Sequence, residues 1–341
     1  MKLKTRTLIL LNIAVFLAGW TGIFGRIISL GGLPLVWYRS MIALFALAAV
    51  LVLMRTSSRP RSVISSTNPP DLFLKRDSSS DSGTKQQDLF LNRLNPGDSS
   101  TNGPTLFPGW RAALMIAGCG VLLGIHWVAF FASIQASNVS IGVACIATSC
   151  FFTSFFDPLI NRHRLSWKDF LISFIAIAGI LLIFSLDVRY RLGIALGLLS
   201  AAVYSVFSIL NVRVASSTGQ DSANMLFYEL IGCVLFLALC MPFYIHLNPD
   251  LPAVPSKSDF WSLLVLGSVF TIIPFLLQIH ALRHLSAFTV NIFYNLEPVY
   301  SIIFAAIIFG ETREVGPSFW FGISLVIISV FLQSRRSIHV N

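Results

Sequence analysis

Long apolar blocks separated by short polar connections dominate the chain. A block of roughly twenty apolar residues has the length of a helix that crosses a bilayer. The sequence contains ten such blocks: Thr7–Phe24, Leu35–Met54, Ala112–Ala132, Val139–Ile160, Asp169–Leu186, Leu192–Asn211, Ala223–Tyr244, Trp261–His280, Ala287–Phe309 and Ser318–Leu332. Because most connections are short, neighbouring helices should form antiparallel hairpins. The pattern predicts an all-α integral membrane protein with ten transmembrane helices in one bundle.

The first block also has features of a secretory signal, with a basic start and an apolar core. However, no small-x-small cleavage site follows it, and the apolar run is long enough to span the membrane. We therefore expect an uncleaved first helix.

Residues 55–111 depart from the apolar pattern. From Thr56 to Pro108 the chain is rich in Ser, Asn, Asp and Pro, a composition that cannot bury enough apolar surface to fold. We expect a flexible cytoplasmic insertion there, with a partner-binding region as the weaker alternative. The remaining boundaries are 1–54 for helices one and two, 112–186 for helices three to five, 187–335 for helices six to ten, and 336–341 for a cytoplasmic tail.

An internal repeat emerges when the chain is shifted against itself by 148 residues. Ile134–Ser149 then aligns with Leu282–Glu297, and helices three to five match helices eight to ten without a gap. Weaker alignments pair Gly19–Gly25 with Val203–Ile209 and Val36–Leu47 with Leu226–Leu237. Each half has five helices, an odd number, so the second half crosses the membrane in the opposite sense. The sequence thus predicts two inverted five-helix repeats, typical of alternating-access transporters, although short apolar segments always align to some degree.

The net charge of +9 raises the question of nucleic-acid binding, and the distribution of the charge answers it. With a cytoplasmic amino terminus, eighteen of the 24 Lys and Arg residues lie on the cytoplasmic side, five lie outside, and Arg39 lies within a span. This bias is typical of membrane proteins and predicts that both termini are cytoplasmic. We expect a multi-pass protein of the cell membrane, placed in the bacterial inner membrane, and no nucleic-acid partner.

The five cysteines, all in predicted spans, have neither a pairing pattern nor a metal-ligand spacing. No phosphate loop or nucleophile constellation is present either. We therefore expect no metal, no cofactor and no enzymatic activity, since an intramembrane enzyme would need paired catalytic groups at one depth.

Three motifs resemble the EamA family of the drug/metabolite transporter superfamily. They are "LEPVYSIIFAAIIFGE" (Leu296–Glu311), "FWFGISLVIISVFLQ" (Phe319–Gln333) and "WYRSMIALFAL" (Trp37–Leu47). The resemblance implies ten helices, cytoplasmic termini and a central substrate cavity between two five-helix halves. The first half departs from the pattern: Ser149 and Cys150 match Glu297 and Pro298, and His163 matches Glu311. The two halves should therefore contribute unequally to the site.

Glu297 and Pro298 are the most conspicuous candidates, because a charge and a proline are costly in the middle of an apolar span. On a continuous helix, Asn291, Tyr294, Glu297 and Ser301 share one face. Pro298 breaks the helix and cannot donate to the Tyr294 carbonyl, which becomes free for a ligand. We predict a substrate-binding face, with a purely structural kink as the alternative.

Arg39 and Glu229 occupy equivalent positions in the two halves, near opposite ends of their spans. Inverted equivalents lie on opposite sides of a cavity, so we predict a gate or access path rather than a direct ion pair. Snorkelling to the nearest interface is the alternative.

Further candidates for the cavity wall are His126, which can titrate near neutrality, and Gln278, Trp20 and Tyr204. For each of them, packing is the alternative.

The function predicted from these features is a membrane permease that moves a small organic solute, such as an amino acid or related metabolite, by alternating access. Export is slightly favoured by analogy. One rival is a nucleotide-sugar-type carrier, which needs several deep basic residues where only Arg39 and His126 are available. The other is a non-transporting membrane scaffold. The expected partners are a small-molecule substrate and the lipid bilayer; proton coupling and a homodimer are left open.

Overall fold

The computed structural model describes residues 3–57, 108–162, 190–282, 293–294 and 296–311, with isolated positions between 167 and 179 and between 320 and 332. Within these ranges every regular element is a helix. Most of the predicted insertion, most of predicted helix five, part of predicted helix ten and the carboxyl-terminal tail lie outside the described residues.

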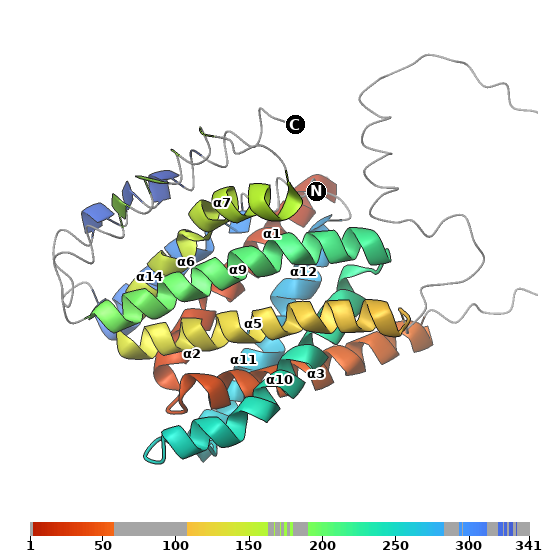
Figure 1. Ribbon diagram of the computed structural model, residues 1–341, viewed down its shortest axis with the longest axis horizontal. Helices are drawn as coiled ribbons and strands as arrows, with labels where there is room; N and C mark the ends of the chain where they lie inside the picture. The colour runs from red at the N-terminus through yellow and green to blue at the C-terminus, as the bar shows by residue number, and fades with distance from the viewer. Residues whose placement is uncertain are drawn as a thin grey trace, which may run out of the picture.

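The helices run side by side in one bundle (Figure 1). Their bounds are α1 Leu3–Gly19, α2 Thr21–Ile27, α3 Gly32–Ser57, α5 Trp110–Ala136, α6 Val139–Ala147, α7 Ser149–Asn161, α9 Arg191–Thr218, α10 Ser222–Leu247, α11 Lys257–Gly267, η2 Ser268–Ile272, α12 Ile273–Leu282 and α14 Glu297–Phe309. η2 is a single π-helical turn that joins α11 to α12.

Seven segments of the described chain are long and apolar enough to cross a membrane: Thr5–Ile27, Gly32–Leu53, Trp110–Ala136, Val139–Asn161, Arg191–Thr218, Ser222–Leu247 and Lys257–Leu277. They coincide with predicted helices one to four and six to eight. The shorter apolar helix α14 carries part of predicted helix nine. The chain is thus an all-helical multi-pass membrane protein, while the total of ten helices stays a prediction.

α5 lies at the centre of the packing and contacts α9, α10 and α3. Its approach to α10 is so close that a Cβ at Gly120 would lie 2.0 Å from the Glu229 carbonyl oxygen. A Cβ at Gly232 would lie 2.1 Å from the Ala117 carbonyl oxygen. Glycine at both positions therefore lets the two backbones touch, as small residues do between membrane helices.

Three of the spans are interrupted part-way. α1 and α2 break at Trp20, α6 and α7 at Thr148, and α14 is preceded by a turn at Leu296. The sequence prediction treated Ala287–Phe309 as one kinked helix, but α14 begins only at Glu297. Pro298 is then its second residue, where the absent backbone N–H needs no partner.

The segments α7 and α14 correspond residue for residue at the predicted spacing of 148. Each has 13 residues, and each is preceded by a residue of similar backbone conformation, Thr148 (φ −75°, ψ −4°) and Leu296 (φ −84°, ψ −12°). Each is followed by a left-handed residue, Arg162 (φ 55°) and Gly310 (φ 67°). This agreement is what the repeat predicts; the inverted relation of the complete halves remains a prediction.

Candidate functional site

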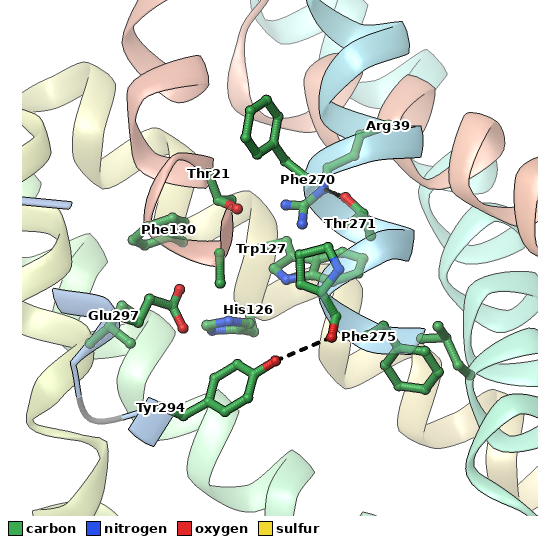
Figure 2. A pocket seen from close by; sticks show the side chains of 14 residues that line it. Thr21, Arg39, His126, Trp127, Phe130, Phe270, Thr271, Phe275, Tyr294 and Glu297 are labelled. Atoms are coloured by element: carbon green, nitrogen blue, oxygen red, sulfur yellow. Dashed lines mark hydrogen bonds between the residues drawn. The ribbon is translucent and has the colours of Figure 1, made fainter. Parts of the chain in front are cut away.

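The three helix breaks surround one cavity of about 220 Å³ (Figure 2). Elements from both halves of the chain form its wall. The polar side chains in the wall are those of Thr21, Arg39, His126, Thr271, Tyr294 and Glu297, and the larger apolar ones are those of Trp127, Phe130, Leu226, Phe270 and Phe275. The cavity is therefore largely aromatic, with a few polar groups directed into it.

Arg39, on α3, is buried, with only 4% of its surface exposed. Its Nε donates to Thr271 Oγ1 at 3.1 Å, and its guanidinium carbon lies 4.4 Å from the centre of the Trp127 ring. Nη1 has no hydrogen-bond partner in the described part of the protein. Arg39 is thus a buried guanidinium in the cavity wall, and its predicted role in a gate or access path stays a prediction.

Glu297, the first residue of α14, directs its carboxylate into the cavity from a different wall (Figure 2). No ion pair joins it to Arg39 among the described residues. Negative charge is favourable at a helix amino terminus. The carboxylate is therefore stabilised by its own helix and remains available to a ligand.

His126 lies between these two charges in the cavity wall (Figure 2). Its Nδ1 lies 3.1 Å from the Ser200 carbonyl oxygen and 2.8 Å from Ser200 Oγ, while Ser200 Oγ donates to the His126 carbonyl oxygen at 2.8 Å. Because a carbonyl oxygen only accepts, Nδ1 carries the proton. In the neutral ring the other nitrogen, Nε2, is then an acceptor.

Tyr294 completes the polar wall next to Glu297. Its hydroxyl donates a long hydrogen bond of 3.5 Å to the Pro274 carbonyl oxygen, marked by the dashed line in Figure 2. This contact connects the turn before α14 to the start of α12.

Other sequence candidates border the cavity without lining it. Ser301 is buried and donates to the Gly19 carbonyl oxygen at 2.7 Å, which joins α14 to α1. The Trp20 ring packs on Phe304, with centroids 4.8 Å apart. The Tyr204 ring lies 4.9 Å from the His126 ring.

Glu229 lies away from the cavity wall. It is buried on α10 and accepts a short hydrogen bond from Asn211 on α9. Asn291 and the side chain of Gln278 lie outside the described residues, so their predicted places stay predictions.

The sequence prediction missed Thr21, Phe270 and Thr271. The π-helical turn η2 displaces the helix locally, and Thr271 Oγ1 donates to the Leu266 carbonyl oxygen at 2.7 Å. Pro274, inside an apolar block, was the available indication of an irregular helix at this place. The break beside Thr21 has no proline, and Gly19 and Gly22, which flank it, are the available indication there.

A model of the EamA-like transporter family matches residues 99–185 and 191–335. The chain belongs to the EamA-like transporter family. The resemblance drawn from the sequence motifs is thereby confirmed, and membership of this family indicates a transporter that is embedded in the membrane and acts on a small molecule.

This EamA-like protein is also similar to a named transporter and to a solved structure. UDP-uronic acid transporter 1 of Arabidopsis thaliana is 23% identical over 233 residues, which cover 66% of this chain and 73% of the plant protein. A solved structure described only as "Crystal structure of protein" matches with a TM-score of 0.52 at 14% identity, covering 96% of both chains. The second match is informative about the fold alone.

Proposed function

We propose that this EamA-like protein is a permease that moves a small organic solute by alternating access, with the solute held in the central cavity. The observation that carries the proposal is the pair of charged side chains in the cavity. The guanidinium of Arg39 and the carboxylate of Glu297 both lie in the cavity wall, and no ion pair joins them among the described residues. Ionisable groups at membrane depth are costly and mark substrate pathways.

The packing of the helices supports the two-fold arrangement that such a mechanism needs. Exchanging the halves turns the contact of α5 with α9 into that of α12 with α1. In the same way, the contact of α5 with α10 becomes that of α11 with α3, and the contact of α7 with α9 becomes that of α14 with α1. All six contacts are present, and so is the self-paired contact of α3 with α10. An inverted repeat predicts this pairing.

The chemistry of the cavity favours a solute that carries both an anionic and a donor group, such as an amino acid or related metabolite. Arg39 supplies a positive charge in the cavity wall for the anionic group. Glu297 and the Nε2 of neutral His126 offer acceptors to an ammonium or hydroxyl group. Aromatic rings cover the remaining wall. Export remains the favoured direction by analogy.

A nucleotide sugar is the second candidate substrate, because the plant relative is named a UDP-uronic acid transporter. Two observations speak against it. Arg39 is the only Arg or Lys in the cavity wall that the structure describes, whereas a diphosphate calls for several cations. The volume of about 220 Å³ also lies below the roughly 300–1,000 Å³ of pockets that hold drug-sized ligands.

The test is solute flux into proteoliposomes that contain the purified protein. The panel holds amino acids, the corresponding amines without the carboxylate, and UDP-sugars, with empty liposomes as the control. We expect saturable flux of amphoteric solutes and little flux of UDP-sugars. Flux of UDP-sugars alone would establish the second candidate, and a silent panel would favour the scaffold.

A further inference from the structure

Three short helices, α2, α6 and α14, form a group at one end of the bundle and contact one another. Each is separated from the rest of its span by a break at the level of the cavity, at Trp20, Thr148 and Leu296. Each also contributes a residue to the cavity wall near that break, namely Thr21, Ile146 and Glu297. Each of the three helices thus begins or ends at the cavity, and the break there is a hinge about which the helix can tilt.

At the ends of α2, α6 and α14 that lie away from the cavity, a single carboxylate bonds to all three helices. Glu311, which follows α14, is 1% exposed and accepts from the Val139 and Ser140 backbone nitrogens of α6 at 3.0 and 2.9 Å. Ser140 Oγ donates to it at 2.5 Å. Arg26, near the end of α2, donates to it from Nη1 at 2.7 Å.

These bonds are of the strong kind. Each has an ionised acceptor, and charge-assisted hydrogen bonds are shorter and stronger than neutral ones. The amide nitrogens of Val139 and Ser140 belong to the first turn of α6, which has no carbonyl partner of its own for them. Arg26 also packs its guanidinium over the Phe309 ring of α14 at 4.6 Å. Separating α2, α6 and α14 at this end therefore requires the hydrogen bonds of Glu311 and the Arg26–Phe309 contact to break.

The predicted repeat allows such a junction at this end only. At the spacing of 148 residues, Glu311 corresponds to His163 and Ser140 to Phe288. In the alignment of Gly19–Gly25 with Val203–Ile209, Arg26 corresponds to Leu210. A leucine and a phenylalanine side chain cannot replace the donors, so the repeat predicts no equivalent charged side-chain junction at the opposite end.

We propose that Glu311 and Arg26 form the latch of a gate at this end of the cavity. When the latch is closed, α2, α6 and α14 are held together and the solute site is shut on this side. When the latch opens, the three helices tilt apart at their breaks, and solvent enters the cavity from this side. With the predicted topology this is the extracytoplasmic side. The inference rests on the proposed function, because a gate presupposes alternating access.

A cysteine in the gate reports the opening. Val143, on α6, is 5% exposed, and its side chain lies 3.4 Å from the position of a Cβ on Gly22 of α2. In a background with the five native cysteines replaced, Val143→Cys is labelled with a water-soluble thiol reagent in detergent, where both ends of the bundle are accessible. Leu47→Cys, fully buried between α3 and α10, reports general loosening.

The latch is opened with Glu311→Gln, and separately with Arg26→Gln, which leaves the buried carboxylate on its α6 donors. Asp259→Asn is the matched control. Asp259 is also a buried carboxylate at this end and accepts from Ser29 N at 2.9 Å and Ser29 Oγ at 2.7 Å, but it joins α11 to the α2–α3 turn.

We expect both latch variants to raise the labelling rate of Val143→Cys by about tenfold or more, since each removes charge-assisted bonds. Leu47→Cys should stay protected, and Asp259→Asn should leave both rates unchanged. The proposal fails if Val143→Cys stays protected, if Leu47→Cys is labelled equally, or if Asp259→Asn has the same effect. Because labelling needs no solute, a silent flux panel would overturn the permease and leave this result standing.

Discussion

A buried arginine and a partly buried glutamate are tolerated in this apolar bundle because each charge is stabilised by its own neighbours. The guanidinium of Arg39 lies over the Trp127 ring and donates a hydrogen bond to Thr271. A cation over an aromatic face is stabilised by the ring quadrupole. Glu297 begins a helix whose dipole favours a negative charge. Neither side chain needs the other, so both stay open to a solute.

Replacing Glu297 with Gln keeps the size of the side chain and removes its titration. Gln imitates the protonated carboxyl, so the variant should behave at every pH as the native protein does at low pH. If the carboxylate carries a coupling proton, the pH dependence of flux disappears; if it only binds the solute cation, flux falls where the native side chain is ionised and matches the native flux at low pH. The measurement is initial flux between pH 5 and 9 in proteoliposomes. Native rates with the native pH profile would make Glu297 a structural residue.

Replacing Arg39 with Gln removes the positive charge from the cavity wall. We expect the KM of an amino acid to rise about tenfold or more, because a charge-assisted hydrogen bond to the solute is lost. The corresponding amine, which has no carboxylate, should show a much smaller change. Arg213→Gln, at an exposed position of α9, is the control. Equal effects on acid and amine would contradict an anion-binding role.

At the scale of the helices, the sequence predicts the spans well and their interruptions poorly. Length and apolarity define a span, so seven predicted spans coincide with helices of the structure. A break depends on tertiary contacts. The break at Trp20 has no proline; glycines flank it, but a glycine pair alone does not fix a break, which also depends on the packing of α1 and α2 against their neighbours. Ser301 illustrates the same limit: a helical face placed it in the cavity, but it bonds Gly19 on α1 instead.

The backbone contact of α5 and α10 makes a prediction about two glycines of one helix. Gly120→Ala places a methyl group against the Glu229 carbonyl and should destabilise the protein by about 1–3 kcal/mol. Gly118→Ala, two residues away, meets nothing within 4 Å and should be neutral or stabilising, since alanine favours a helix by about 1 kcal/mol. Thermal unfolding of both variants in detergent checks this difference. Equal melting temperatures would show that the two helices separate easily.

At the scale of the whole molecule, the class and the family could be recognised from the sequence, and the family match confirms both. The cavity could be anticipated only in part. Arg39, His126, Tyr294 and Glu297 were marked by charge, titration or a neighbouring proline, and they line one cavity. Phe270 and Phe275 line it as well, but they resemble ordinary packing residues in the sequence. Only the way the helices cross selects them.

The orientation of the molecule in the membrane is predicted by its basic residues. Eighteen of 24 Lys and Arg residues fall on the side of the amino terminus, against five on the other, and this excess is retained in the cytoplasm. An even number of spans then brings the carboxyl terminus to the same side. Asn341→Cys, in the background without native cysteines, should react with an impermeant thiol reagent only after the membrane is opened. Reaction in intact cells would show that the carboxyl terminus lies outside the cytoplasm and would contradict the predicted orientation.

The polar insertion makes the last prediction. α3 ends at Ser57 and α5 begins at Trp110, so the segment to be removed lies between these helices apart from Ser57, the last residue of α3. The composition between them is too polar to form a core. Replacing Ser57 to Leu106 with a short Gly-Ser linker should therefore leave the melting temperature and the flux nearly unchanged. A second variant keeps the length but scrambles the order, which destroys the related "DLFLKR" and "DLFLNR" segments. If the deletion loses flux while the scrambled chain keeps it, length matters; if both lose flux, those segments have a function and the insertion is part of the working protein.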